Sequence, residues 1–251
     1  MDGTATCSRS SDGSLRSEAS QVKTIGMIGG MSWESTVPYY RQVNEAVKAR
    51  LGGLHSAQVV LYSVDFHEVE RLQHEGNWEG AGRLLATAAQ AVERAGADFL
   101  VLCTNTMHRV APAIEAAVAI PLLHIADPTA AAVRHAGIDT VGLLGTRFTM
   151  EQDFYRGRLR ERHGLRVLVP DVQPRELVHR LIYDELCLGR TSDASRAAFR
   201  RIMADLAARG ARGIILGCTE IGLLVGADDA PVPLFDTTEL HALAAAEQAL
   251  A

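Results

Sequence analysis

The sequence of 251 residues lacks several features that would assign it to a common functional class. Its cysteines have no CxxC or zinc-finger spacing, which argues against a structural zinc site at Cys7, Cys103, Cys187 and Cys218. No apolar stretch is long enough to cross a bilayer. Acidic and basic residues are interspersed, and the net charge of −5 argues against nucleic acid and anionic membranes as partners.

The start of the chain also lacks a secretory signal. The first 22 residues are rich in Ser, with Gly, Asp and Arg, and contain no apolar segment, so we expect a disordered leader. Four unpaired cysteines without a signal sequence predict a reducing, cytoplasmic location. With 47% hydrophobic residues, the chain can bury one large core or two smaller ones.

From residue 23 onward, apolar runs bounded by glycine alternate with helical patterns. The runs predict strands over residues 24–28, 58–63, 99–102, 120–124, 140–144, 166–169, 213–217 and 232–235. The helical patterns cover residues 35–50, 77–95, 108–118, 175–188 and 192–209, with further helices ending near 163 and beginning at 238. This alternation predicts an α/β fold with parallel sheets, in which ligands bind beyond the carboxyl ends of the strands.

The two halves of the chain resemble one another. Residues 24–29 match residues 140–145, and residues 96–102 match residues 210–216 at nearly the same separation. We interpret the matches as a duplication, although convergent composition of buried strands is an alternative. Duplication predicts two Rossmann-like or flavodoxin-like domains, related by a pseudo-two-fold axis, with equivalent strand ends facing across an interdomain cleft.

We expect the N-terminal domain to comprise residues 23–128 together with 230–251, whose final helix packs back onto it. Residues 129–229 would then form the second α/β domain. Nothing in the sequence determines the oligomeric state, and a homodimer is kept as a candidate assembly.

The internal repeat decides which side chain at the first strand end faces the cleft. Matching the two Cys-Thr dipeptides would align Cys103 with Cys218, but this match requires a one-residue gap. The ungapped match aligns Thr104 with Cys218 instead. Because successive side chains of a strand point to opposite faces, the two alignments place opposite residues in the cleft. We expect Thr104 to face Cys218 and Cys103 to pack inside the sheet.

These strand ends resemble the motifs of the aspartate/glutamate racemase superfamily, whose members work without a cofactor through two facing cysteines. The superfamily motifs are Cys-Asn-Thr and Gly-Cys-Thr followed by His or Glu. They correspond here to Thr104-Asn105-Thr106 and Gly217-Cys218-Thr219-Glu220. The resemblance runs from residue 23 to the end, includes residues 29–35 and 143–149, and is nearest to the aspartate/glutamate branch. The departure is Thr104, where most members have cysteine.

The resemblance implies a PLP-independent racemase of acidic amino acids that uses neither cofactor nor metal. Cys218 would remove the α-proton of the L-isomer, and Thr104, or a water it holds, would return a proton to the opposite face. A helix N-terminus after the strand would lower the pKa of the Cys218 thiol. The residues expected to bind the substrate are Met31, Ser32, Ser63, Asn105, Thr106, Arg147, Thr219 and Glu220.

Several of these residues have a structural alternative. Ser32 could cap a helix, and Arg147 could form a surface ion pair instead of binding a side-chain carboxylate. Glu220 would repel an acidic substrate unless a cation or the substrate ammonium group pairs with it. His108 could relay a proton or cap its helix. Asp65 could line the site or cap a turn. Cys103 is expected to pack in the sheet, with a back-up role as the alternative, and Cys7 and Cys187 are expected to have no role. A metal site is one interpretation of a group without HExxH spacing, for which a solvated helix face is the expected one: His67, Glu68, Glu70 and His74.

Two other functional classes are compatible with one cysteine at the site. One is a decarboxylase or cis–trans isomerase of a small diacid, and the other is a non-catalytic protein that binds amino acids. Loss of the α-proton signal of an amino acid in D₂O distinguishes a racemase from both.

Overall fold

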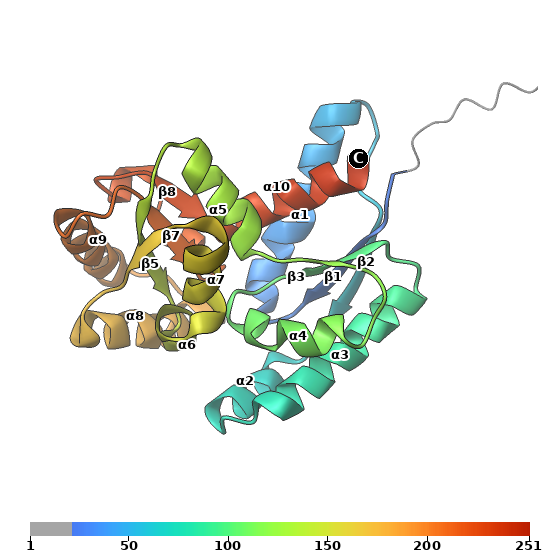
Figure 1. Cartoon of the computed structure of the whole chain (residues 1–251), viewed down its shortest axis with the longest axis horizontal. Coiled ribbons are helices and arrows are strands. Elements are labelled where there is room, and N and C mark those ends of the chain that lie inside the picture. Colours follow the sequence, from blue (N-terminus) through green and yellow to red (C-terminus); the bar gives the residue numbers. More distant parts are fainter. Residues whose placement is uncertain (1–21) are drawn as a thin grey trace, which may run out of the picture.

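The computed structural model describes residues 22–251, which form two four-stranded parallel sheets (Figure 1). The leader expected over residues 1–22 therefore lies outside the described residues, except for Val22. The first sheet has the order β2-β1-β3-β4 and contains β1 (Ile25–Gly29), β2 (Val59–Ser63), β3 (Phe99–Leu102) and β4 (Leu122–Leu123). The second has the order β6-β5-β7-β8 and contains β5 (Thr140–Gly145), β6 (Arg166–Leu168), β7 (Ile214–Gly217) and β8 (Leu234–Asp236). The predicted α/β fold with parallel sheets is confirmed.

The central strand pairs of the two sheets also share their register. In the first sheet Gly26 pairs with Leu100, and in the second Gly142 pairs with Ile214. These two pairs are equivalent under the ungapped match of the two halves. A one-residue gap would have paired Gly142 with Ile215 instead. The pairing therefore agrees with the ungapped alignment, in which Thr104, and not Cys103, is the equivalent of Cys218.

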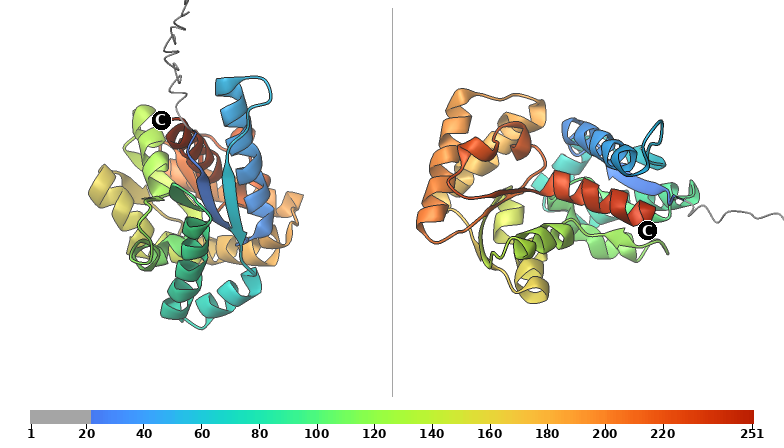
Figure 2. Two further views of the ribbon diagram at one scale, coloured as in Figure 1. Left: turned by 90° about the vertical axis from the view of Figure 1, so that its right-hand side faces the viewer. Right: turned by 90° about the horizontal axis from the view of Figure 1, so that it is seen from above.

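Helices connect the strands and cover both sheets (Figure 2). In chain order, the α-helices are α1 (Trp33–Leu51), α2 (Phe66–His74), α3 (Trp78–Arg94), α4 (Ala111–Glu115), α5 (Ala126–His135), α6 (Arg147–Glu151), α7 (Asp153–His163), α8 (Val172–Asp184), α9 (Asp193–Ala208) and α10 (Thr237–Leu250). The short 3₁₀ turns are η1 (Thr106–Val110), η2 (Leu186–Leu188), η3 (Ile221–Leu223) and η4 (Ala227–Asp229).

Two of these helices differ from the sequence prediction. Helix α2 is not among the helical segments predicted above; it begins at Phe66 because the Asp65 carboxylate accepts a hydrogen bond from the backbone N–H of His67 and caps the helix. The cap confirms the structural reading of Asp65. Helix α5 occupies residues 126–135, for which no element was predicted; its short Ala-rich segment has a proline in the first turn and a weak apolar pattern.

Each sheet contributes to a buried core. One face of the first sheet packs with α3 around Leu85 and Leu100, and the other packs with α1 and α10 around Tyr39 and Phe99. The second sheet has a core of its own, which includes Leu143, Ile215, Met203 and Phe199. Of the two expectations, one large core or smaller separate ones, the structure shows separate cores for the two sheets.

The C-terminal segment connects the two sheets. Strand β8 pairs with β7 and so belongs to the second sheet by its hydrogen bonds. Helix α10 then leaves that sheet and runs beside α1, as the red and blue helices show in Figure 2. We retain the division into residues 23–128 with 230–251 and 129–229 as a proposal, with the qualification that residues 234–236 pair within the second sheet.

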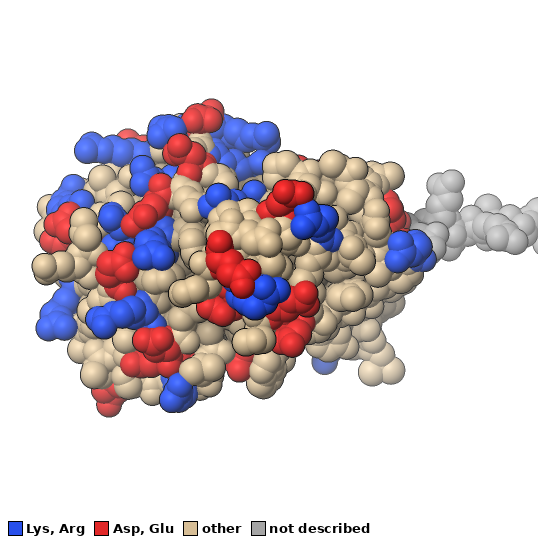
Figure 3. Space-filling view, turned by 90° about the horizontal axis from the view of Figure 1, so that it is seen from below, with Lys and Arg blue, Asp and Glu red and all other residues tan. Residues whose placement is uncertain are grey.

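No helix within residues 22–251 is long and apolar enough to span a bilayer. Lys and Arg side chains alternate with Asp and Glu over the face seen in Figure 3, in agreement with the interspersed charge of the sequence.

Candidate active site

A small buried cavity of about 20 Å³ lies where the carboxyl ends of the central strands meet. Its lining from the first half is Met31, Phe66, Gln73, Thr104, Asn105 and Thr106. Its lining from the second half is Thr146, Ile182, Tyr183, Cys187, Cys218 and Glu220. Ligand sites of open α/β sheets occur at such strand ends. Besides Thr104 and Cys218, four of the residues expected to bind substrate line this cavity: Met31, Asn105, Thr106 and Glu220. Thr219 lies between Cys218 and Glu220 in the sequence but is not part of the lining.

The two strand-end residues that the repeat makes equivalent are found at the same cavity. Thr104 and Cys218 both line the cavity, from opposite halves. Cys103 instead packs inside the first sheet, where its thiol lies 3.8 Å from the carbonyl oxygen of Val101 and burial raises its pKa. The packing reading of Cys103 is therefore confirmed.

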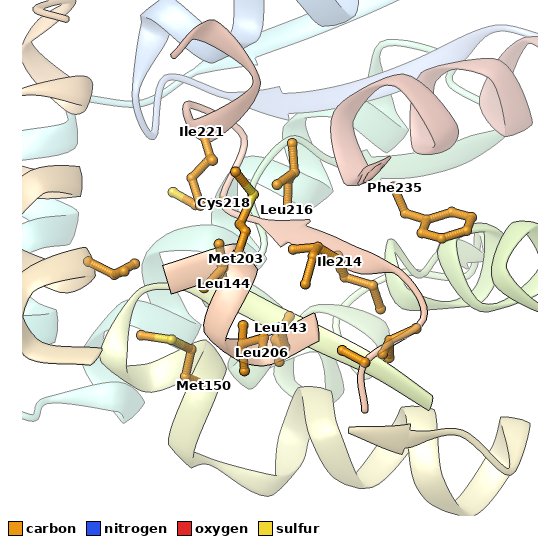
Figure 4. Packing of buried hydrophobic residues seen from close by; sticks show 14 of the residues in the cluster. Leu143, Leu144, Met150, Met203, Leu206, Ile214, Leu216, Cys218, Ile221 and Phe235 are labelled. Atoms are coloured by element: carbon orange, nitrogen blue, oxygen red, sulfur yellow. The ribbon is translucent and has the colours of Figure 1, made fainter. Parts of the chain in front are cut away.

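The glycine before Cys218 allows the second-half strands to approach closely. Gly145 of β5 pairs with Gly217 of β7. A Cβ atom on Gly145 would lie 2.6 Å from the carbonyl oxygen of Gly217, which is closer than carbon and oxygen approach without a bond. Glycine at both positions thus brings Cys218 to the end of a tightly paired strand, next to Ile221 and Leu216 at the edge of the core (Figure 4).

Glu220 joins the two halves beside the cavity. Its side chain is buried, and its Oε1 accepts hydrogen bonds from the backbone N–H (3.2 Å) and the hydroxyl (2.8 Å) of Ser32. Its Oε2 accepts from the thiol of Cys218 (2.9 Å) and the hydroxyl of Thr219 (2.9 Å). Four donors therefore stabilise the carboxylate in place of a cation. Ser32 occupies the N-cap position of α1, but its side chain bonds Glu220 and not the helix.

The environment of Cys218 overturns the expected lowering of its pKa. Strand β7 is followed by the short 3₁₀ turn η3 and not by an α-helix, so the helix N-terminus expected directly after this strand is not formed. Burial and then the adjacent Glu220 carboxylate raise the pKa of Cys218 well above its ordinary value. In this closed arrangement the Cys218 thiol donates a hydrogen bond to the Glu220 carboxylate.

Asn105 presents an unpaired acceptor. Its Nδ2 lies 2.9 Å from the hydroxyl oxygen of Thr237, and that hydroxyl donates to the carbonyl oxygen of Leu216 at 2.8 Å. Because the Thr237 proton is already used, its oxygen must accept from Nδ2, which fixes the orientation of the Asn105 amide. Within residues 22–251, Oδ1 of Asn105 is buried without a hydrogen-bond partner. A buried acceptor of this kind favours a ligand with an N–H group.

A group of threonine hydroxyls closes another side of the cavity. The hydroxyl oxygens of Thr106 and Thr146 lie 2.9 Å apart, one from each half. Thr149 lies within 3.5 Å of both. Thr146 was not among the site residues predicted from the sequence. Its position shortly after the predicted strand over residues 140–144 was a signal that could have identified it.

A larger cleft of about 570 Å³ lies outside the cavity. Gln73 of α2 and Tyr183 of α8 line both spaces, and the Tyr183 hydroxyl donates to the Gln73 side-chain oxygen at 2.8 Å. The two side chains therefore form a barrier between the outer cleft and the cavity. Neither residue, nor Cys187, carried a signal in the sequence as a member of the site, because all three come from helices and not from strand ends.

Two residues expected to bind substrate lie outside the cavity. Arg147 lines the outer cleft and forms a half-exposed ion pair with Glu176 at 3.6 Å, so the surface ion-pair alternative is the one observed. Ser63 is exposed on the edge strand β2 and lines a separate surface depression. Strand β2 is the outermost strand of its sheet and has only β1 beside it.

Comparison with known proteins gives a consistent answer. The family model described as Asp/Glu/Hydantoin racemase matches residues 28–245. The crystal structure of a putative Asp/Glu racemase from Yersinia pestis is 62% identical, covers 91% of this chain and 100% of its own, and superposes with a TM-score of 0.85. An aspartate racemase homologue from Pyrococcus horikoshii OT3 is 35% identical, covers 90% and 99%, and gives a TM-score of 0.76.

One relative has a broader described activity. The broad specificity amino-acid racemase RacX of Bacillus subtilis is 23% identical over 85% of this chain and 92% of its own. The family model covers most of the chain, and two relatives with solved structures exceed 30% identity over nearly its full length. The chain therefore belongs to the Asp/Glu/hydantoin racemase family, a family of isomerases.

Proposed function

We propose that the protein racemises the acidic amino acids aspartate and glutamate without PLP. Cys218 removes the α-proton of the L-isomer, and Thr104, or a water that it holds, returns a proton to the opposite face. The observation that carries the proposal is that Cys218 and Thr104 line one buried cavity from the ends of equivalent strands. Racemisation needs a proton-transferring group on each face of the α-carbon, and two facing strand ends supply them.

The polar groups around the cavity match an amino acid. The unpaired Oδ1 of Asn105 and the Glu220 carboxylate suit the substrate ammonium group. The hydroxyls of Thr106 and Thr146 suit the α-carboxylate. Negative charge grows on this carboxylate as the carbanion develops, so hydroxyl donors placed there stabilise the transition state more than the ground state.

The preference for acidic substrates rests on the outer cleft. Arg147 and Arg180 line this cleft together with Gln73 and Tyr183, which separate it from the cavity. A substrate side chain that extends toward this cleft would pair its second carboxylate with Arg180, or with Arg147 in exchange for Glu176. A neutral side chain would gain nothing there.

Substrate ammonium next to Glu220 also provides a way to activate the thiol. In the closed arrangement the Glu220 carboxylate contributes to the raised pKa of Cys218. A bound cation offsets that effect, because an adjacent positive charge favours the thiolate. Thr219 and Ser32 act through Glu220 in this proposal, since both donate hydrogen bonds to it.

The cavity must open for the substrate to enter. A space of about 20 Å³ has room for about one water molecule, whereas an amino acid has many more heavy atoms. Separation of the halves would break the contacts that cross between them: Ser32 with Glu220, Thr106 with Thr146 and Gln73 with Tyr183. Closing again around the substrate excludes water while the carbanion exists.

The proposal is tested by proton NMR of L-Asp and L-Glu in D₂O with the enzyme. We expect the α-proton signal of both to disappear while the carbon skeleton stays intact. Parallel samples hold neutral and basic L-amino acids. Loss of the α-signal from neutral amino acids alone would contradict the acidic preference, and retention by every amino acid would contradict racemisation. New signals from a shortened skeleton would indicate a decarboxylase instead.

The pH dependence of exchange follows from the raised pKa of Cys218. The thiolate is the base, so a raised pKa makes the reactive form scarce at neutral pH and scarcer as the pH falls. We expect the exchange rate at low substrate concentration to increase about tenfold per pH unit and still to increase above about pH 8.5, the ordinary pKa of a thiol. A profile of kcat/KM for exchange measures this. A plateau beginning below neutral pH would contradict a raised thiol pKa in the free enzyme.

A further inference from the structure

His108 makes a direct contact with the backbone of Thr104. It lies in the 3₁₀ turn η1, is buried, and its Nδ1 is 2.7 Å from the Thr104 carbonyl oxygen. Its Nε2 lies 3.2 Å from the backbone nitrogen of Ile125. An amide N–H can only donate, so Nε2 is the acceptor and the ring proton sits on Nδ1. The Thr104 carbonyl therefore receives a hydrogen bond from one defined tautomer.

The surroundings of His108 exclude the proton relay considered from the sequence. Both ring nitrogens are occupied by backbone groups, and His108 does not line the cavity. The rings of His124 and His241 lie 4.4 and 6.1 Å away, and burial lowers the pKa of all three histidines, to about 2 for His124 and about 4 for His241. A neutral ring with both nitrogens engaged by backbone groups holds a position and relays no proton.

Thr104 depends on such a contact because it lies beyond the sheet. Strand β3 ends at Leu102, and the backbone N–H of Thr104 turns back to the carbonyl oxygen of Leu102 at 2.8 Å. Within residues 22–251, its side-chain hydroxyl makes no hydrogen bond, so the position of the hydroxyl depends on the Thr104 backbone and on its side-chain rotamer. The carbonyl bond from His108 is the side-chain contact on that backbone.

We propose that His108 is a positioning residue for Thr104. By holding the Thr104 carbonyl, it fixes the hydroxyl on the side of the cavity opposite Cys218. The inference rests on the proposed function. All hydrogen-bond partners and ring neighbours of His108 come from the first half or from α10, and none is Cys218 or Glu220. Loss of the His108 bond therefore affects proton return to the opposite face and leaves proton removal by Cys218 in place.

Two amide variants separate the two bonds of His108. The His108→Asn side chain can place an N–H near the position of Nδ1 and so keep the bond to Thr104. The His108→Gln side chain reaches the position of Nε2, so it can accept from Ile125 but cannot bond Thr104. His124→Leu is the control for loss of a neighbouring buried imidazole that does not contact Thr104. Thermal unfolding of each variant verifies that it is folded.

The readout is the ratio of two products formed from L-Asp in D₂O. Deuterated L-Asp reports exchange on the Cys218 face, and D-Asp reports proton return from the Thr104 face. For His108→Gln we expect D-Asp formation to fall about tenfold relative to exchange, the factor that corresponds to one hydrogen bond. His108→Asn should stay within about threefold of the wild-type ratio, and His124→Leu should change both products by one common factor.

An equal fall of both products in His108→Gln would overturn the positioning role, as would equal ratios for the Gln and Asn variants. These results leave the proposed function intact, because exchange persists in the wild type. Absence of exchange in the wild type overturns the proposed function, and the positioning role with it. If His108→Gln fails to fold, the ratio for His108→Asn decides: a fall of tenfold or more, about the size of one lost bond, contradicts the proposal.

Discussion

Cys218→Ala is expected to abolish α-proton exchange of L-Asp and L-Glu, with a fall in rate of about 10³-fold or more. Cys218 lies at the end of β7 and lines the cavity together with Thr104. In the proposed mechanism it is the base on the L face, and its removal leaves no thiolate there. A threonine hydroxyl is far too weak a base to replace it. The measurement is deuterium incorporation into the L-isomer, followed by NMR over hours to capture the residual rate.

Cys187→Ala is the matched control for this experiment. Cys187 lines the same cavity, and burial and Glu220 raise the pKa of its thiol as well. It lies in the turn η2 and not at a strand end facing Thr104. We expect this variant to retain exchange within about tenfold of the wild type. Exchange that survives in Cys218→Ala and disappears in Cys187→Ala would assign the base to Cys187.

Thr104→Cys is expected to increase D-isomer formation relative to exchange by about 10²-fold. A thiol is a much stronger acid than a hydroxyl, and its thiolate is a competent base, so the variant has a proton-transferring group on each face. Enantiomers have equal free energies in water, so kcat/KM must be equal in both directions before and after the change. The gain should therefore appear with either enantiomer as the substrate. Optical rotation or chiral chromatography measures inversion, and NMR measures exchange.

Thr104→Ser is the control, because it keeps a hydroxyl while it removes the methyl group. Its ratio of inversion to exchange should remain near that of the wild type. An unchanged ratio in Thr104→Cys would contradict the assignment of Thr104 to the second face. An increase in both Thr104→Cys and Thr104→Ser would attribute the gain to space in the cavity instead of acidity.

The placement of the strand-end residues was predictable because it depends on local rules. Alternation of strand and helix indicated parallel sheets, and the ungapped repeat set the register that brings Thr104 and Cys218 to one cavity. The two-residue period of a strand converts a register directly into a side-chain direction. The same logic failed for Ser63, because the end of an edge strand meets solvent on one side.

The remaining site residues depend on tertiary packing. Gln73, Tyr183 and Cys187 reach the cavity from α2, α8 and η2, and the angle at which a helix crosses a sheet is not written in its own apolar pattern. The pKa of Cys218 could not be foreseen either. It depends on burial and on a carboxylate two residues later whose direction is set by Ser32, 188 positions away in the chain.

The barrier that Gln73 and Tyr183 form between the outer cleft and the cavity has a consequence for inhibition. The outer cleft of about 570 Å³ is within the range of small-molecule sites, and it remains accessible while the cavity is shut. A compound lodged there against both side chains would stabilise the closed arrangement by its binding free energy. It would slow the entry of substrate and the release of product without resembling an amino acid, and it would compete with an acidic substrate, whose side chain is proposed to extend into the same cleft.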